Sequence, residues 1–393
     1  MRLRALLPLL ALPLLGAGLA LQRAAGDPPA LTVISPVHLT QLSDDEAVKL
    51  VAEAHDPEDG ELGASVLWTS SRDGVLGSGA SLSRTLSVGT HTVTAQVSDA
   101  EGLRARVPVD VQVTAGGHVL LSAGDIASCN STGDEATAAL LDRSFGSVLT
   151  LGDNAYPGGT PTDFQSCYEP SWGRHKARTR PVVGNHEYRG GNAAGYYAYF
   201  GAVAGAPTQG WYSYDLGGWH VVVLNSNCRE IGGCTRSSPQ GLWLEADLAA
   251  HPRDCTLAAW HHPRFSSGSK HGSSTATREL YGIAHEHGVD VILTGHDHHY
   301  ERFAPQDAFG VADASAPRQF VVGSGGASLR PMGDIEPNSV TSAGRVVGVL
   351  ELTLHDASYD WRFLPAAGHT YTDSGSASCV VTSEPMAAPL SAR

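Results

Sequence analysis

The chain has 393 residues, which at about 150 residues per domain is enough for two or three domains with buried cores. Hydrophobic residues make up 42% of it and charged residues 17%, a composition that excludes a largely disordered protein. The 26 basic residues are outnumbered by 40 acidic ones, giving a formal net charge of −14, and no basic stripe could neutralise a phosphate backbone. We therefore expect no stable nucleic-acid binding.

Residues 1–25 have the pattern of a secretory signal peptide. Arg2 and Arg4 precede an apolar run at residues 5–15, and small residues suited to signal-peptidase cleavage follow. A membrane anchor is the alternative, but prolines interrupt the run and it falls short of the roughly 20 residues that span a bilayer. We expect a secreted, periplasmic or cell-surface protein with no membrane span after signal removal.

The six cysteines form an even set, which in an exported chain favours disulfides over free thiols. Cys228 and Cys234, which flank a loop with two glycines, are the best local pair, and the pairing of the other four stays open. No CxxC spacing occurs, so a cysteine metal site is not expected.

Residues 28–115 contain short alternating runs separated by turn clusters, and this pattern predicts a β-sandwich with Trp68 in its core. The pattern resembles secreted immunoglobulin-like or PKD-like modules. Its acidic turn at residues 56–60 could hold calcium. We favour the alternative, a solvated turn in which Asp56 accepts hydrogen bonds from its own backbone.

Beyond residue 117, short continuous apolar runs alternate with amphipathic stretches. The expected buried strands are residues 118–122, 148–151, 181–183, 220–224, 257–260 and 289–293. The expected helices are residues 135–143, 241–250 and 277–287. This alternation predicts an α/β layered domain over residues 118–383, with a second sheet completed by residues 320–364.

Side chains that commonly bind metals follow five of these strands. They are Asp125, Asp153, Asn185, His261, His296 and His298. A single Asp after a strand is usually a turn or helix-cap residue, and a single His is usually a surface or core residue whose hydrogen bonds are satisfied. Five such strand ends, however, can meet in one crevice. Carboxylate, amide and imidazole groups in this number suit two cations about 3.5–4 Å apart. An extended segment at residues 296–298 would put both imidazoles on one face.

Five sequence blocks resemble the ordered motifs of the calcineurin-like metallophosphoesterases over roughly residues 118–365. The blocks are Gly124-Asp125, Gly152-Asp153-Asn154-Ala155-Tyr156, Gly184-Asn185-His186-Glu187, His261-His262-Pro263 and Gly295-His296-Asp297-His298-His299-Tyr300-Glu301-Arg302. The chain is most similar to the purple acid phosphatase branch, because Ala127 replaces the usual histidine and Tyr156 stands three residues after Asp153. The resemblance implies two β-sheets flanked by helices.

The same resemblance implies a binuclear metal centre. One ion would be held by Asp125, Asp153, Tyr156 and His298, and the other by Asp153, Asn185, His261 and His296. A phenol with a pKa near 10 ionises at low pH only beside a strongly polarising cation, so the expected cofactors are Fe(III) plus a divalent Fe, Zn or Mn ion. The alternative role for Tyr156 is ring packing or loop capping.

The expected reaction is hydrolysis of small phosphomonoesters by metal-activated hydroxide, as in an acid phosphatase. His186 and His271 are the candidate catalytic residues that protonate the leaving group, although a surface role for His271 is the alternative. We expect His262 to border the crevice, Glu187 to orient His186 or a water molecule, and Glu301 to pair with Arg302.

Two other functions are open. A phosphodiesterase or nucleotide hydrolase would use the same fold and metals with different pocket walls. A catalytically silent surface-binding protein would use the sandwich for recognition, but all the expected ligands are present, which argues against it. The oligomeric state is not predicted.

Overall fold

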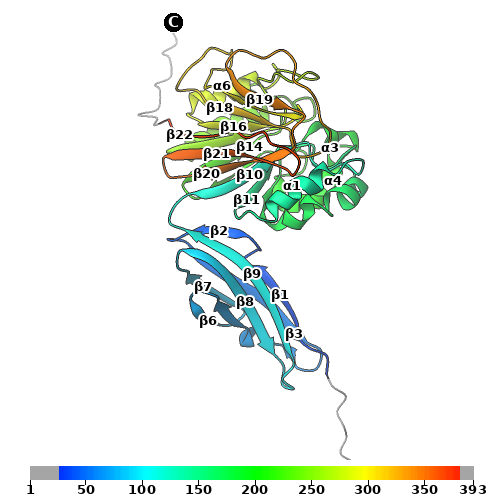
Figure 1. Ribbon diagram of the computed structural model, residues 1–393, viewed down its shortest axis with the longest axis vertical. Coiled ribbons are helices and arrows are strands. Elements are labelled where there is room, and N and C mark those ends of the chain that lie inside the picture. The colour runs from blue at the N-terminus through cyan, green and yellow to red at the C-terminus, as the bar shows by residue number, and fades with distance from the viewer. Residues whose placement is uncertain (1–25, 381–393) are drawn as a thin grey trace, which may run out of the picture.

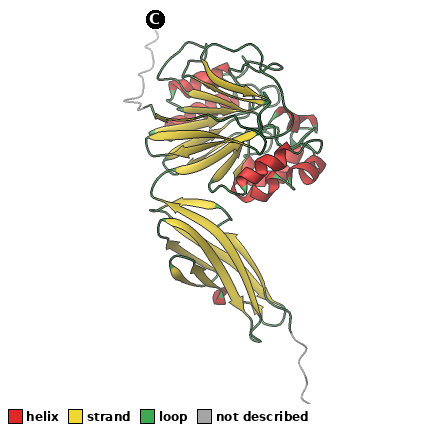
Figure 2. Cartoon of the chain, viewed as in Figure 1, coloured by secondary structure: helices red, strands yellow, loops and turns green. Residues whose placement is uncertain are grey.

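The computed structural model describes residues 26–380, which form a smaller β-sandwich and a larger α/β unit (Figure 1). The predicted signal peptide, residues 1–25, and the last residues of the expected catalytic domain lie outside this range. Within it, no helix is long and apolar enough to cross a membrane. Nearly all the helical segments belong to the larger unit (Figure 2).

The sandwich consists of two sheets. One contains β1 (Ala30–Ser35), β3 (Ala47–Asp56), β4 (Gly60–Glu61) and β7 (Ser81–Thr85). The other has the order β2 (Thr40–Ser43), β9 (Arg104–Thr114), β8 (Gly89–Ser98), β5 (Leu67–Ser70) and β6 (Gly74–Ser78). Alternate residues of β3 are buried, as expected for a strand with one face on a core, and they pack in a cluster that includes the fully buried Trp68.

The acidic turn of the sandwich has the backbone-capping geometry that the sequence favours. Asp56 Oδ1 accepts hydrogen bonds from the backbone N–H groups of Glu58 and Asp59, at 3.0 and 2.8 Å. This turn also contacts the β8–β9 turn, because Ala100 N donates to Asp59 Oδ2 at 2.7 Å.

The larger unit contains two mixed sheets. The six-stranded sheet has the order β12 (Thr179–Arg180), β11 (Ser147–Thr150), β10 (His118–Ala123), β20 (Gly348–Leu354), β21 (Ser358–Pro365) and β22 (Ser374–Ser378). The seven-stranded sheet has the order β13 (Tyr212–Leu216), β14 (Trp219–Val223), β15 (Cys255–Ala259), β16 (Val291–Thr294), β18 (Arg318–Val322), β17 (His299–Phe303) and β19 (Ser339–Gly344). Strands β10 to β12 are parallel, as are β14, β15, β16 and β18.

The two sheets pack face to face, with helices on the outside. Val221 and Val223 of β14 point into the core shared with the six-stranded sheet, while Val222 points into a second core beneath α5 and α6. The helices are α1 (Gly133–Leu141), α3 (Asn185–Arg189), α4 (Ala194–Phe200), α5 (Pro239–Ala250) and α6 (Arg278–Glu286). Short helical segments are α2 (Pro161–Asp163), Gly63–Ser65, Phe164–Tyr168, Trp172–Arg178 and Gly201–Ala204. This architecture confirms the predicted fold class.

Two local predictions are wrong. Residues 181–183 are not a strand: the ladder ends at Arg180, because Pro181 has no N–H to donate to it. Residues 320–364 do not complete one sheet, since β18 and β19 join the seven-stranded sheet and β20 and β21 join the other.

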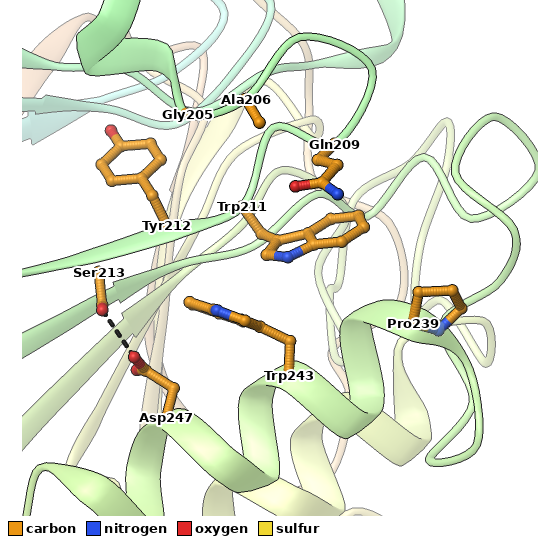
Figure 3. Close-up of a pocket in the computed structure, with 9 residues that line it drawn as sticks. All are labelled: Gly205, Ala206, Gln209, Trp211, Tyr212, Ser213, Pro239, Trp243 and Asp247. Carbon is orange, nitrogen blue, oxygen red and sulfur yellow. Dashed lines mark hydrogen bonds between the residues drawn. The ribbon is translucent and has the colours of Figure 1, made fainter.

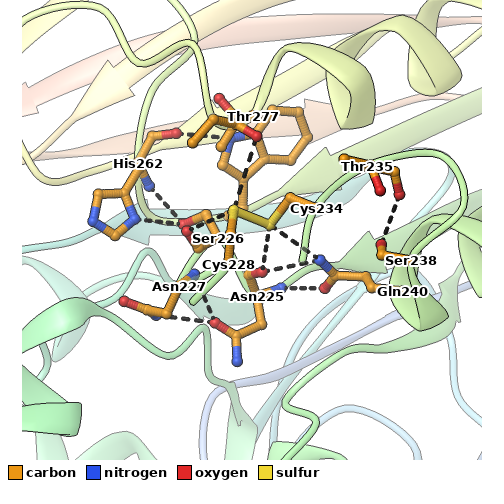
Figure 4. The surroundings of a disulfide bond; sticks show 12 residues. Asn225, Ser226, Asn227, Cys228, Cys234, Thr235, Ser238, Gln240, His262 and Thr277 are labelled. Carbon is orange, nitrogen blue, oxygen red and sulfur yellow. Dashed lines mark hydrogen bonds between the residues drawn. A yellow bond between two sulfur atoms is a disulfide. The ribbon is translucent and has the colours of Figure 1, made fainter. Parts of the chain in front are cut away.

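Three disulfides link the larger unit. The predicted Cys228–Cys234 bond is confirmed (Figure 4). The other two join Cys129 to Cys167 and Cys255 to Cys379.

Candidate metal centre

The predicted ligands come together where strands of both sheets end. Asp125 and Asp153 follow β10 and β11 of the six-stranded sheet, and His261 follows β15 of the seven-stranded sheet. Asn185 begins α3, while His296 and His298 lie in the bend between β16 and β17. The carboxyl ends of parallel strands from two packed sheets therefore supply one cluster.

Tyr156 and two carboxylates form one half of this cluster. The Tyr156 hydroxyl lies 2.9 Å from Asp125 Oδ1 and 3.1 Å from Asp153 Oδ2. His298 Nε2 is 3.2 Å from Asp125 Oδ1 and 3.3 Å from the same hydroxyl. These four side chains are the expected ligand set of the first ion.

The second half is centred on His261. Its Nε2 atom lies 3.3 Å from Asp153 Oδ1, 3.1 Å from Asn185 Oδ1 and 3.2 Å from His296 Nδ1. Ligand atoms of Asp125, Asp153 and His261 are all within 4.8 Å of one another. Asp153 thus contacts both expected ligand sets.

Three of these residues have left-handed backbone conformations. The φ angles are 58° at Asp125, 50° at Asp153 and 71° at His296, a region that side chains other than glycine rarely adopt. Hydrogen bonds between the motifs stabilise these turns: Asp125 Oδ2 accepts from His296 N at 2.7 Å, and Asp153 Oδ1 accepts from His186 N at 2.8 Å. Such strain is typical of positions where function fixes the side-chain direction.

The imidazoles of His261 and His298 are oriented by hydrogen bonds on their far sides. His261 Nδ1 donates to the Leu151 carbonyl at 2.7 Å, and His298 Nδ1 to the Ser328 carbonyl at 2.9 Å. Because a carbonyl only accepts, Nδ1 of each ring carries a proton. The Nε2 atom of each ring faces the cluster, as in many metal-binding histidines. The segment at residues 296–298 is a bend, not an extended strand, so contacts rather than alternation set these orientations.

The buried carboxylates and imidazoles of the cluster shift one another's pKa values. Although burial lowers the pKa of His261, the negative charge of Asp153 raises it to about 9. In turn, despite burial, the positive charge of His261 holds the pKa of Asp153 well below its usual range. Buried carboxylates that attract protons onto neighbouring imidazoles suit a site that binds cations.

Glu187 is fully buried and holds the Asp153 loop against the start of α3. Its carboxylate accepts hydrogen bonds from the backbone N–H groups of four residues. These are Asp153, Asn154, Ala155 and Gly184, at 3.1, 2.8, 3.3 and 2.7 Å. The expectation that Glu187 orients His186 or a water molecule is therefore wrong, because its oxygens are used by backbone donors.

Replacing Glu187 by glutamine is expected to lower the affinity of the cluster for metal ions by about 10–100-fold, the usual effect of losing a group that positions metal ligands. The amide nitrogen cannot accept from a backbone N–H, so the Asp153 loop loses part of its support. Equilibrium metal binding measures the effect, with Glu169→Gln on the surface as the control. Unchanged metal affinity in Glu187→Gln would contradict this role.

The remaining candidate residues border the cluster. His186 Nδ1 donates to the Pro157 carbonyl at 2.7 Å, and its Nε2 lies 3.7 Å from Asp153 Oδ2. The ring of His271 lies 4.1 Å from that of His296. His262 lies 4.3 Å from His296, ring to ring, and its Nδ1 is 2.8 Å from the Ser226 hydroxyl (Figure 4).

Comparisons with known proteins agree with this geometry. Residues 110–300 match the family model of the calcineurin-like phosphoesterases. The larger unit is thus similar to the calcineurin-like phosphoesterases, and for this similarity it is called the phosphoesterase domain. Purple acid phosphatase 23 of Arabidopsis thaliana is 26% identical over 246 residues, covering 53% of this chain and 52% of that protein. Phosphoenolpyruvate phosphatase of Allium cepa is 28% identical over 216 residues, covering 46% and 43%.

The solved structures show the same fold at low sequence identity. Purple acid phosphatase PPD1 from yellow lupin (Lupinus luteus) seeds has a TM-score of 0.61 at 15% identity, covering 90% of this chain and 75% of that one. The chain spans about half, or less, of the length of the first curated relatives it matches. The comparisons therefore show a similarity to calcineurin-like phosphoesterases and to purple acid phosphatases.

Several contacts of the phosphoesterase domain are not apparent from the sequence motifs. Ser328 and Arg330 lie on a loop that is distant from the motifs in sequence. In the structure Ser328 contacts His298, and Arg330 contacts His271. The expected Glu301–Arg302 pair is wrong: Arg302 binds Asp373, at 2.8 and 2.9 Å, and Glu301 accepts from His299 at 3.1 Å. Strand alternation, which puts neighbours on opposite faces, could have excluded that pair.

A cavity of about 470 Å³ lies between residues 205–213 and α5 of the phosphoesterase domain. The indole rings of Trp211 and Trp243 border it, and Asp247 accepts a hydrogen bond from Ser213 at 2.8 Å (Figure 3). None of the expected metal ligands lines this cavity. The groups suited to catalysis gather instead at the strand ends.

Proposed function

We propose that this chain is an exported phosphatase with a binuclear metal centre that hydrolyses small phosphomonoesters. The observation that carries the proposal is the buried cluster that ligand-type side chains from separate segments form around Asp153. Export is supported by the signal-peptide pattern of residues 1–25 and by three disulfides.

The donor set fits two cations. Asp125, Asp153, Tyr156 and His298 would hold one ion, and Asp153, Asn185, His261 and His296 the other. Carboxylate, amide and phenol oxygens with imidazole nitrogens suit iron, manganese and zinc, and Tyr156 favours Fe(III) with a divalent Fe, Zn or Mn ion. When bound, the cations supply Lewis acidity and lower the pKa of water.

The chain's own residues would orient the substrate and move one proton. Water that has released one proton to the solvent would add through its oxygen to phosphorus as the ester P–O bond breaks, and the leaving alkoxide would then need a proton. His186, in its protonated form, would donate it from Nε2, because its Nδ1–H is already used by the Pro157 carbonyl. His271 stays a second candidate, but its Nε2 accepts a hydrogen bond from Arg330 at 3.1 Å.

The direct test is phosphate release from p-nitrophenyl phosphate together with metal analysis of the purified protein. We expect about two metal ions per chain. We also expect p-nitrophenyl phosphate to be hydrolysed faster than bis-p-nitrophenyl phosphate. A strong excess of diester turnover would instead favour the phosphodiesterase alternative. Protein supplied with iron, manganese and zinc that bound no metal and released no phosphate would favour the silent surface-binding alternative.

Replacing Tyr156 by phenylalanine is expected to remove a visible absorption band from tyrosinate bound to Fe(III), while the second ion is retained. The hydroxyl is the only group lost, so the ring contact with His186, at 4.2 Å between centroids, is preserved. A visible spectrum and metal analysis measure the result, with Tyr188→Phe as the matched control. A band of equal intensity in Tyr156→Phe would rule out Tyr156 as the chromophore.

A further inference from the structure

Residues 266–272 and 327–333 form two loops beside the proposed metal centre. Hydrogen bonds join these loops into one rim. Gly333 N donates to the Ser267 carbonyl at 2.7 Å, and the Ser269 hydroxyl donates to the Pro331 carbonyl at 2.9 Å. Buried Asp297, between the two histidines of the last motif, accepts from Gly272 N at 2.9 Å. The rim therefore has a fixed position relative to His296 and His298.

The second loop is also tied directly to the expected ligands. Ala327 N donates to the Asp125 carbonyl at 2.9 Å, and the Ser328 hydroxyl lies 2.7 Å from His298 Nδ1. Leu329 points outward, with 48% of its surface exposed. The next side chain, Arg330, returns to the site, where its Nη1 donates to His271 Nε2 at 3.1 Å.

Arg330 has no acidic partner among residues 26–380. The arginines that form ion pairs there, within 4.0 Å, are Arg174, Arg236, Arg253, Arg302 and Arg362. Arg264, the other arginine near this rim, is used elsewhere, since its Nε donates to the Ala308 carbonyl at 2.9 Å and its guanidinium lies over Phe265. A guanidinium held by one neutral imidazole beside a cluster of expected metal ligands keeps donors free for an anion.

We propose that Arg330 is a specificity-determining residue that binds a non-bridging oxygen of a phosphomonoester dianion. This inference rests on the proposed phosphatase function. A monoester carries three non-bridging oxygens, and a diester carries two with a single negative charge. If the binuclear centre engages two oxygens, only a monoester offers a third to the rim. A charge-assisted hydrogen bond from a guanidinium to that oxygen would favour monoesters.

The test compares two esters with the same leaving group, p-nitrophenyl phosphate and bis-p-nitrophenyl phosphate. Arg330→Met is expected to lower kcat/KM for the monoester by about 10–100-fold, as for loss of a hydrogen bond to a charged group, and for the diester by less than about threefold. Arg330→Lys keeps the charge and is expected to be intermediate. Lys270→Met, an exposed cation of the facing loop, is the matched control and is expected to change neither substrate's kinetics.

A second readout is equilibrium binding of inorganic phosphate by calorimetry, which needs no turnover. Arg330→Met is expected to weaken phosphate binding about 10–100-fold with unchanged metal content. Equal losses for both esters, or unchanged phosphate affinity, would overturn the inference. Wild-type protein that hydrolysed neither ester would contradict the proposed function, and phosphate binding would still decide the role of Arg330.

Discussion

Replacing Asp153 by alanine is expected to lower kcat/KM for a phosphomonoester by at least about 1,000-fold, since bound metal ions supply several kcal/mol of transition-state stabilisation. The carboxylate of Asp153 is the group that contacts both proposed ligand sets, through Tyr156 at 3.1 Å and His261 at 3.3 Å. Its loss should therefore weaken both ions, not one. Initial-rate kinetics and metal analysis of the same preparation measure the two effects.

The matched control for this substitution is a second buried aspartate in the same domain. Asp134 of α1 accepts a hydrogen bond from the Ser171 hydroxyl and lies outside the cluster. Burial raises its pKa to about 6, so an uncharged side chain is tolerated there, and Asp134→Asn is expected to retain activity within about threefold. Asp153→Ala that kept both metals and full activity would remove the basis of the proposed function.

Much of the fold was predictable because the strands of the larger unit are buried on both faces. Continuous apolar runs mark such strands, and β10, β11, β14, β15 and β16 all lie close to their expected positions. Sheet membership was less predictable, because it depends on partners distant in sequence. The antiparallel pairing of β20 with β10, for example, joins segments more than 200 residues apart.

The ligand-type residues of the site were predictable because each belongs to a short motif, and most of these motifs follow a strand. The groups that orient them were not, since they are backbone carbonyls or belong to unrelated segments. The Leu151 carbonyl directs His261, and Ser328 directs His298. Arg330 is 59 residues from His271 in sequence, and no local pattern distinguishes it from a solvated arginine. Local patterns carry residue type and spacing, whereas these contacts arise from the packing of the two sheets.

Removing the Cys255–Cys379 disulfide is expected to lower the free energy of unfolding of the phosphoesterase domain by about 5 kcal/mol, the loop-closure value for a loop of this length. The bond closes a separation of 124 residues and joins the start of β15, in the seven-stranded sheet, to the residue that follows β22, in the six-stranded sheet. Both cysteines are buried, so alanine is the better replacement than serine, whose hydroxyl would lack a partner. Urea unfolding of Cys255→Ala/Cys379→Ala measures the change.

The Cys228–Cys234 bond provides an internal comparison, because it spans only 6 residues. Constraint of so short a loop is expected to contribute only about 2 kcal/mol, so Cys228→Ala/Cys234→Ala should unfold at a urea concentration between those of the wild type and the other double variant. This order follows from loop length alone, since both bonds lie in the same domain. Equal destabilisation by the two double variants would show that local packing, and not restriction of the unfolded chain, determines what these disulfides contribute.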